Sequence, residues 1–179
     1  GNSCISIFGS FVAARVNSMY KVGVIGPEST GKSTLSSYLA NRYNGLLVPE
    51  YAREYMERRA LARAYTREDV LRIAEYQVEY MRRLFAEDKH GSRYEYVFFD
   101  TELIITKIWL LHKYGNCPDW IEQAIHQYPM DVYLLCYPDL PWEPDPVREN
   151  PTIREYLFDW YEHEIQALNI PYYIVRHVE

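Results

Sequence analysis

Short apolar runs alternate along the chain with longer segments in which apolar residues recur at helical spacing. Five short runs have the length and the β-branched or aromatic content of buried strands: YKVGVIG (20–26), GLLVPE (45–50), YEYVFFD (94–100), DVYLLCY (131–137) and PYYIV (171–175). The helical patterns lie between them, at 32–43, 66–85, 101–114 and 151–168. Strands that alternate with helices predict an α/β fold of three layers, built around a mainly parallel five-stranded sheet.

Two local signals mark helix starts. Thr66 and Asp69 have the spacing of a capping box, so a helix is expected to begin at that point. Pro118 suits the first turn of a further helix, where the N–H that proline lacks is not needed. The proline-rich segment 137–151 fits no regular element. We expect it to form a long surface loop, and its proline interruptions suit a lid hinged between ordered elements.

The composition restricts the class of protein. The 179 residues suit one domain, and 48% apolar with 25% charged residues is the balance of a globular protein. The formal net charge of −6 argues against a nucleic-acid binder, which needs a concentrated basic face. No apolar run reaches the ~18 residues of a membrane span. Cys4, Cys117 and Cys136 lack metal-ligand spacing, so we expect a cytoplasmic protein with reduced cysteines.

The start of the chain differs in character from the rest. Residues 1–18 lack the basic start and the continuous apolar segment of a signal peptide. Met19 stands directly before the first predicted strand. We therefore expect residues 1–18 to be a dispensable N-terminal extension and residues 19–179 to form a single domain.

Residues 26–33 read GPESTGKS, which matches the P-loop pattern G-x-x-x-x-G-K-S between a predicted strand and a predicted helix. Gly26 and Gly31 let the backbone turn tightly and aim N–H groups at phosphate oxygens, and the helix that follows adds its positive N-terminal end. Lys32 would reach the β- and γ-phosphates of ATP, and the Ser33 hydroxyl would ligate Mg²⁺. The other residues expected to bind ATP in this motif are Ser29, Thr30 and Thr34.

Two acids end predicted strands: Asp100 follows EYVFF, and Glu50 follows GLLVP. Ligands of an open α/β sheet collect beyond the carboxyl ends of the strands, so both acids are expected beside the P-loop. Asp100 is the candidate Mg²⁺ ligand, and Glu50 is the candidate that binds or deprotonates an acceptor hydroxyl. The opposite assignment, with Asp100 as the base, stays open, and so does a helix-capping role for Asp100.

The segment PEYAREYMERR extends this site. Arg53 lies three residues after Glu50, a spacing that places both on one side of a helix. Arg53 is a candidate for binding a phosphate or a ribose-linked group, and Tyr51 is a candidate substrate contact. A solvated helix arginine paired with an acid is the alternative for Arg53. Tyr76 and Tyr80, on one face of the next predicted helix, are candidates for stacking on an aromatic ring.

The proline-rich loop carries Asp145 and Arg148, and Arg154 follows it. Loops that deliver arginines to a transferring phosphate stabilise the charge on its oxygens. We therefore expect Arg148 to take part in catalysis, Arg154 to bind ATP and Asp145 to contact the substrate. Exposed arginines without such a role are the alternative.

The segments GPESTGKSTL, PEYAREY, FFDTELIITKIW and LLCYPDLPWEPDPVREN together resemble the ribosylnicotinamide kinase family, the kinase domain of NadR-type NAD-salvage proteins. The resemblance runs from about residue 20 to residue 171. It implies a nucleoside-kinase-like P-loop fold and ATP-dependent phosphorylation of the 5′-hydroxyl of nicotinamide riboside to nicotinamide mononucleotide. By matched motif, it assigns ATP and Mg²⁺ to Lys32 and Ser33, the metal or the base to Asp100, the riboside to Glu50 and Arg53, and the lid to Arg148.

The sequence thus predicts a Mg²⁺- and ATP-dependent kinase whose partner is a small nucleoside, nicotinamide riboside foremost, with neither a nucleic acid nor a membrane as partner. Two alternatives stay open. The chain could be another nucleoside kinase, because the chemistry at Glu50 and Arg53 suits any ribosyl hydroxyl. It could also be a regulatory module that binds or slowly hydrolyses ATP and signals to a partner.

Overall fold

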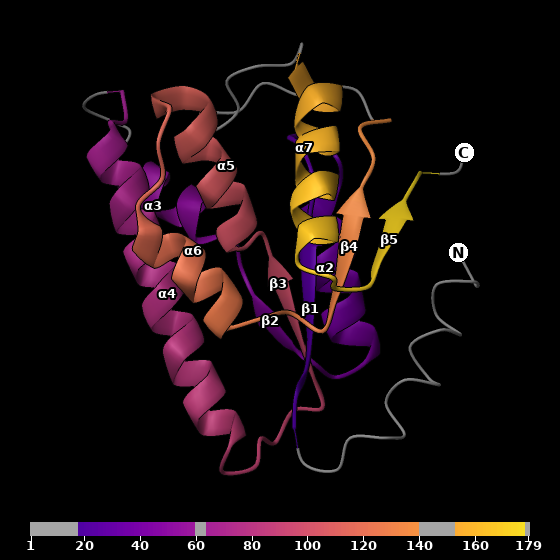
Figure 1. Cartoon of the computed structure of the whole chain (residues 1–179). Helices are drawn as coiled ribbons and strands as arrows, with labels where there is room; N and C mark the ends of the chain where they lie inside the picture. The colour runs from indigo at the N-terminus through magenta and orange to yellow at the C-terminus, as the bar shows by residue number, and fades with distance from the viewer. Residues whose placement is uncertain (1–17, 60–63, 140–152, 178–179) are drawn as a thin grey trace.

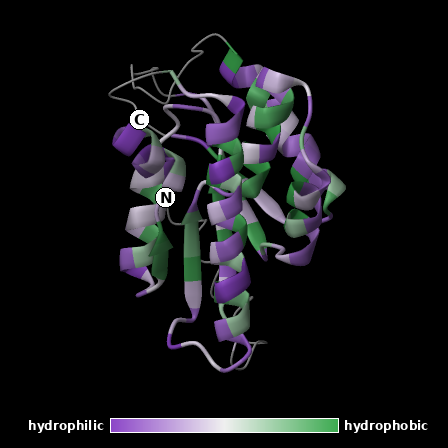
Figure 2. Ribbon diagram, turned by 90° about the vertical axis from the view of Figure 1, so that its left-hand side faces the viewer, coloured by the Kyte–Doolittle hydropathy of each residue, from purple (hydrophilic) through white to green (hydrophobic). Residues whose placement is uncertain are grey.

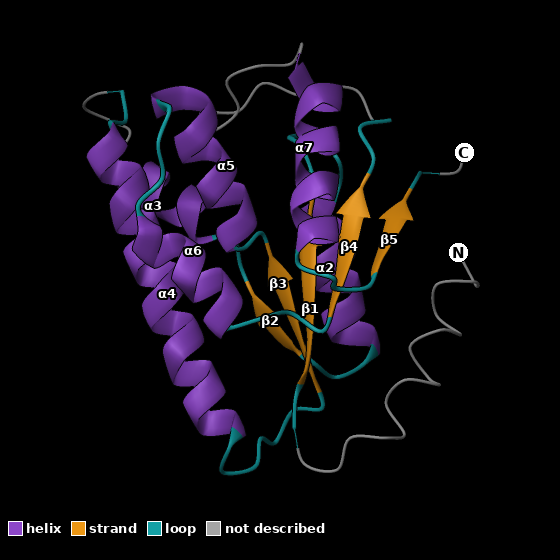
Figure 3. Cartoon of the chain, viewed as in Figure 1, coloured by secondary structure: helices purple, strands orange, loops and turns teal. Residues whose placement is uncertain are grey.

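The computed structural model of the chain describes residues 18–59, 64–139 and 153–177. Strands and helices alternate along these segments, as Figures 1 and 3 show. In chain order the elements are β1 (Tyr20–Ile25), α2 (Lys32–Arg42), β2 (Leu46–Val48), α3 (Tyr51–Arg59), α4 (Arg67–Asp88), β3 (Tyr96–Asp100), α5 (Leu103–Tyr114), α6 (Asp119–Gln127), β4 (Val132–Cys136), α7 (Arg154–Ala167) and β5 (Tyr172–Val175).

The five strands form one sheet in the order β2-β3-β1-β4-β5. Every neighbouring pair in this sheet is parallel. The prediction of a mainly parallel five-stranded sheet is therefore confirmed. Because the strands are parallel, their carboxyl ends meet at one edge, which lies uppermost in Figure 1. The P-loop follows β1, and Glu50 and Asp100 come at the ends of β2 and β3, so this edge collects the candidate site.

Helices cover both faces of the sheet and give the three predicted layers (Figure 1). On one face, α2 contributes Leu39 and Ala40 to a cluster with alternate strand residues such as Val22 and Val24. On the other face, α4 to α7 pack against the strand residues that point the opposite way, such as Ile25. Figure 2 shows the same division, with strongly apolar strands between helices whose outward faces are hydrophilic.

The start of α4 is confirmed, and the start of α5 differs from the sequence-based expectation. Thr66 accepts a hydrogen bond from the Asp69 N–H while the Asp69 carboxylate accepts from the Thr66 N–H at 2.7 Å, which completes the capping box. The pattern at 101–114 predicted a helix from Thr101, but α5 begins at Leu103 with Glu102 as its N-cap. Thr101 instead adopts a left-handed backbone with φ of 70°.

A close approach of β1 to β4 places a tyrosine beneath the site. Gly23 is paired with Tyr133 in the sheet, and a Cβ on Gly23 would lie 2.8 Å from the Tyr133 ring. The missing side chain leaves room for that ring, which is fully buried. The Tyr133 hydroxyl donates a hydrogen bond to the carboxylate of Glu102. Glycine in this strand therefore positions a hydrogen-bond donor at the edge where the site lies.

Met19 is part of the packed structure. Its side chain is buried, and its N–H donates to Asp88 Oδ1 at 2.6 Å. Residues 1–17 lie outside the described residues, so the division between an extension (1–18) and a single domain (19–179) stays a prediction. Within the described ranges, no helix combines the length and the apolar character required to cross a membrane.

Candidate functional site

The loop between β1 and α2 has the geometry of an anion cradle. Ser29 and Gly31 both adopt positive φ, 57° and 80°, and Gly31 is the N-cap of α2. Because glycine has no side chain, nothing from Gly31 covers the first N–H groups of the helix. Thr30 Oγ1 donates to the Pro27 carbonyl at 2.8 Å, and Lys32 Nζ donates to the same carbonyl at 2.9 Å. The predicted P-loop residues are thus arranged around one turn.

Gly26 allows this loop to pass close to the neighbouring strand. A Cβ at this position would lie 2.7 Å from the backbone carbonyl of Cys136, at the end of β4. Any side chain at position 26 would therefore push the loop away from the sheet. Thr34, another predicted contact, lies in the first turn of α2 with its side chain exposed.

Asp100 meets the P-loop helix directly. Ser33 Oγ donates to Asp100 Oδ2 at 2.6 Å. Asp100 is buried, and its Oδ1 has no hydrogen-bond partner within the described part of the chain. Mg²⁺ takes few protein ligands and completes its shell with water and phosphate. The Ser33 hydroxyl and the Asp100 carboxylate, which are in contact, therefore fit this ion. No group of three or more histidines, cysteines or acids converges in the described ranges. The alternative capping role of Asp100 is not observed, because Glu102 caps α5.

Glu50 and the start of α3 form the opposite side of the site. The segment PEYAREYMERR is helical from Tyr51 to Arg59, as the argument for a shared face required. Arg53 Nε lies 3.6 Å from Glu50 Oε2, and both side chains are partly buried. Arg53 thus lies beside Glu50 as expected. Glu50 is also an acid partner for this arginine, as the alternative interpretation of Arg53 required.

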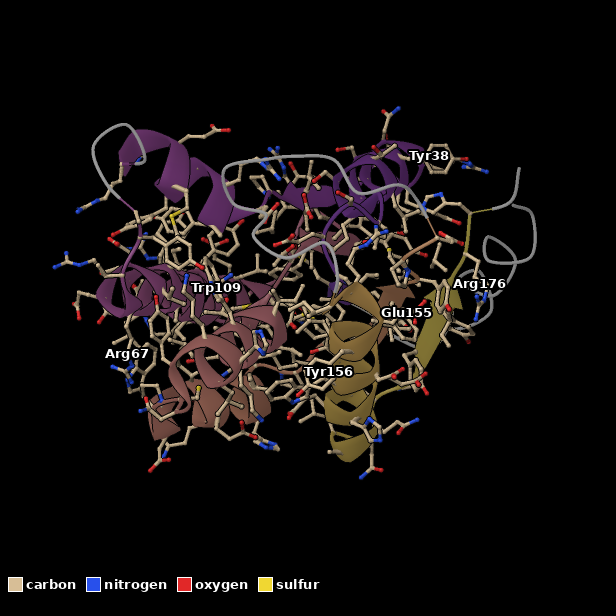
Figure 4. The ribbon with its side chains drawn as sticks, turned by 90° about the horizontal axis from the view of Figure 1, so that it is seen from above. Tyr38, Arg67, Trp109, Glu155, Tyr156 and Arg176 are labelled. Atoms are coloured by element: carbon tan, nitrogen blue, oxygen red, sulfur yellow. The ribbon has the colours of Figure 1, made fainter. Side chains whose placement is uncertain are left out.

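A cavity joins the phosphate cradle to Glu50. Gly26, Lys32 and Glu50 line one end, and Thr101 lies among them. The far end is formed by α5 and by the residues before α4, chiefly Tyr65, Trp109 and His112. Figure 4 looks down on this edge of the sheet and labels Trp109 on α5 and Tyr156 on α7. The lining therefore combines charged residues of the P-loop and of a strand end with aromatic residues from α5 and from the segment before α4.

The aromatic end of the cavity is held in a fixed arrangement. Trp109 Nε1 donates to the Tyr65 hydroxyl at 3.0 Å, and the two rings meet edge to face with centroids 5.1 Å apart. Lys113 Nζ also donates to this hydroxyl, at 2.7 Å. These aromatic residues were not identified from the sequence. The position of Trp109 in the helical pattern at 101–114 was visible, but nothing in that pattern separates a ligand-facing aromatic residue from a core residue.

Only part of the predicted lid lies within the described residues. Arg154 is the first residue of α7, and its Nη1 lies 3.5 Å from the backbone carbonyl of Glu28 in the P-loop. This residue is therefore where an ATP-binding arginine was expected. Asp145 and Arg148 lie outside the described residues.

Tyr51, Tyr76 and Tyr80 lie in a second groove between α3 and α4, separate from the cavity beside Lys32. Tyr51 and Tyr76 stack on each other with centroids 3.6 Å apart and rings inclined by 12°. Their mutual stacking gives these side chains a packing role. Thr101 lines this groove as well as the main cavity.

Glu102 is a buried acid that the sequence did not single out. Its Oε1 accepts from the Ile104 N–H at 2.9 Å. Burial is the main cause that raises its pKa to about 7, although hydrogen bonds from the Ile104 N–H and from Tyr133 oppose the shift. Because the folded state holds this proton more tightly than the unfolded chain, Glu102 stabilises the fold fully below about pH 4.5 and loses that contribution as the pH rises to about 7.

Replacing Glu102 with glutamine is expected to raise the free energy of unfolding at pH 8 by roughly 3 kcal/mol relative to the parent protein, and by much less at pH 5. The amide keeps an acceptor for the Ile104 N–H and carries no charge. Urea unfolding midpoints at the two pH values measure the difference. Glu75→Gln, at an exposed position of α4, is the control and should change little. An equal gain at both pH values would contradict the assignment.

Comparisons with known proteins agree with this geometry. A family model described as AAA domain matches residues 21–179. The chain belongs to the AAA domain family. The trifunctional NAD biosynthesis/regulator protein NadR of Escherichia coli (strain K12) is 30% identical to this AAA domain over 131 residues. That alignment covers 71% of the chain and 30% of NadR. The resemblance to NadR-type proteins, stated above from the motifs, is confirmed.

Solved structures show the fold of this AAA domain. A crystal structure of NadR protein in complex with NR matches with a TM-score of 0.69 at 22% identity, over 87% of this chain and 45% of that one. Deoxyadenosine kinase from M. mycoides, with products bound, matches with a TM-score of 0.56 at 16% identity, over 87% and 89% of the two chains. The predicted P-loop, nucleoside-kinase-like fold is confirmed. The chain spans about 30% of the curated NadR proteins that it matches.

Proposed function

We propose that this chain is a cytoplasmic Mg²⁺- and ATP-dependent kinase that phosphorylates the 5′-hydroxyl of nicotinamide riboside to give nicotinamide mononucleotide. The observation that carries the proposal is the cavity whose lining includes both the P-loop lysine, Lys32, and the strand-end acid, Glu50. A phosphate donor and a hydroxyl acceptor can meet only in such a shared space. Nicotinamide riboside also fits the similarity to NadR, a protein of NAD biosynthesis.

The P-loop end of the cavity suits the triphosphate of ATP. Lys32 Nζ, which now donates to the Pro27 carbonyl, can exchange that acceptor for a phosphate oxygen. Ser33 and Asp100 would hold Mg²⁺, which when bound neutralises charge on the β- and γ-phosphates. The contact between Ser33 and Asp100 supports this role for Asp100, and we therefore propose Glu50 as the base.

The aromatic end suits the base of the acceptor. The ring of nicotinamide riboside carries a positive charge, and aromatic side chains such as Trp109 attract a cation over their faces. The hydrogen bond from Trp109 to Tyr65 fixes this side chain before a ligand arrives, which lowers the entropic cost of binding. Among the described lining residues, Lys32 is the only lysine or arginine, and it lies at the phosphate end.

The phosphoryl group then passes from ATP at the P-loop to the acceptor hydroxyl beside Glu50. The acceptor oxygen attacks the γ-phosphorus in line, the bond from that phosphorus to the β–γ bridging oxygen breaks, and ADP leaves. Glu50 takes the proton of the acceptor hydroxyl. Lys32 and Arg154, both at the P-loop, would neutralise charge on the phosphates, and we propose the same for Arg148 in the lid. Arg53, whose Nε lies 3.6 Å from Glu50 Oε2, would hold that carboxylate toward the riboside, and Asp145 is a further proposed substrate contact.

We expect ATP consumption in the presence of Mg²⁺ to depend on a riboside and to be fastest with nicotinamide riboside. The test is a panel of nicotinamide riboside, adenosine, deoxyadenosine, cytidine and uridine, with the product identified by mass. Formation of nicotinamide mononucleotide at the highest kcat/KM supports the proposal. Preference for a neutral riboside would replace it with another nucleoside kinase, and ATP hydrolysis that no riboside accelerates would favour the regulatory module.

A further inference from the structure

Thr101 combines backbone strain with a buried hydroxyl that lacks a partner. Its φ of 70° lies in the left-handed region, which β-branched residues seldom adopt. The residue is 8% exposed, and its Oγ1 makes no hydrogen bond within the described ranges. Strain and an unsatisfied buried hydroxyl each destabilise a fold, and strained residues of this kind concentrate at functional sites.

The neighbours of Thr101 explain how the strained conformation is held. The Thr101 N–H donates to the Val24 carbonyl at 3.0 Å, which anchors the residue to β1. Asp100, before it, is turned toward Ser33, and Glu102, after it, is turned toward the N–H of Ile104. The side chains on either side of Thr101 thus bond to two different partners, while the Thr101 hydroxyl between them has none among the described residues.

Thr101 lies where the two reactants are proposed to meet. Thr101 lines the same cavity as Lys32 and Glu50, which mark the phosphate and acceptor sides. We propose that Thr101 is a further catalytic residue, whose Oγ1–H donates a hydrogen bond to a non-bridging oxygen of the γ-phosphoryl group during its transfer. This inference rests on the proposed phosphotransferase function and deepens it.

A donor at this point acts on the transition state. Charge is spread over the three equatorial oxygens of the phosphoryl group while its bond to ADP breaks and its bond to the acceptor forms. A fixed donor placed beside these oxygens stabilises that charge more than it stabilises bound ATP. Thr101 keeps its own proton throughout, because the proton of the acceptor passes to Glu50.

Thr101→Val removes the hydroxyl and keeps the shape, the β-branching and the backbone strain. We expect kcat to fall about 10- to 100-fold, with the KM values for ATP and for the acceptor within about threefold of the parent values. The thermal midpoint should not fall, since an unsatisfied buried hydroxyl has been removed. Thr101→Ser, which restores the hydroxyl, should recover most of kcat.

Thr106→Val is the matched control for stability. Thr106 is also buried and lines the same cavity, but its Oγ1 donates to Gln77 Oε1 at 2.7 Å. Its replacement leaves that acceptor unpaired and should lower the thermal midpoint. A Thr101→Val protein with the parent kcat would overturn the inference. So would a loss confined to the acceptor KM, since that pattern marks uniform binding of the acceptor and no contact specific to the transition state.

The assay also separates this inference from the proposed function. The acceptor used is whichever riboside the parent protein phosphorylates. If none is phosphorylated, the proposed function fails, and the rate of Mg–ATP hydrolysis is compared in single turnovers with water as the acceptor. A hydrolysis rate about 10-fold lower in Thr101→Val supports the role of the hydroxyl even then, and equal rates overturn it.

Discussion

Replacing Asp100 with asparagine is expected to reduce phosphoryl transfer by roughly 10³-fold. Asparagine keeps the shape of the side chain and an acceptor for Ser33 Oγ, which lies 2.6 Å from Asp100 Oδ2. It loses the negative charge that would hold Mg²⁺. Initial rates across a series of Mg²⁺ concentrations measure the effect, and added Mg²⁺ should restore little of it.

The Asp100→Asn change should affect the stability of the protein differently from its activity. Asp100 is buried with Oδ1 unpartnered among the described residues, so the thermal midpoint without nucleotide should stay level or rise. Asp88→Asn is the matched control. Both oxygens of that buried carboxylate accept hydrogen bonds, from the Met19 N–H and from Lys21 Nζ. We expect this control to unfold at a lower temperature and to keep its kcat. An Asp100→Asn protein that transfers phosphate at the parent rate would remove the residue from the metal site.

Replacing Glu50 with glutamine is expected to lower kcat for transfer by about 10²- to 10⁴-fold while ATP affinity changes less than about twofold. Glutamine has nearly the same size but cannot take the proton of the acceptor hydroxyl at neutral pH. ATP binding should persist because the P-loop contacts do not involve this residue. Steady-state transfer rates and titration with a non-hydrolysable ATP analogue measure the two quantities.

Glu54→Gln provides the control for the loss of a nearby negative charge. Glu54 lies one turn further along α3 and pairs with Arg58 at the surface. Its loss should leave kcat unchanged, because an exposed pair of this kind contributes little. Transfer by Glu50→Gln at the parent rate would exclude Glu50 as the base. The base would then be sought at Asp100, the assignment that the sequence left open.

The parts of the site predicted from the sequence are those that depend on local chain geometry. The P-loop was identified because Gly31, Lys32 and Ser33 occupy consecutive positions whose backbone conformation is shared by all such loops. The approach of Asp100 to the P-loop followed from the rule that parallel strands end at one edge. That rule needs only the strand and its last residue, both of which can be read from YEYVFFD.

The other parts depend on contacts between distant residues. Trp109 and Tyr65 are 44 positions apart and belong to different segments, so their hydrogen bond has no signature along the chain. Thr101 fitted the helical pattern that follows it. Its departure from that pattern depends on its N–H bonding to Val24 and on Glu102 taking the cap. Tertiary contacts thus override the local preference there.

Gly23 also links positions that a sequence alignment would treat as independent. The ring of Tyr133 occupies the space of a side chain at position 23, and the Tyr133 hydroxyl supports Glu102, which caps α5. An alanine at position 23 would displace that ring, and Glu102 would lose a donor in a buried place. A side chain at position 23 would therefore also disturb the N-terminus of α5, the helix that carries Trp109, although the two segments are far apart in the sequence.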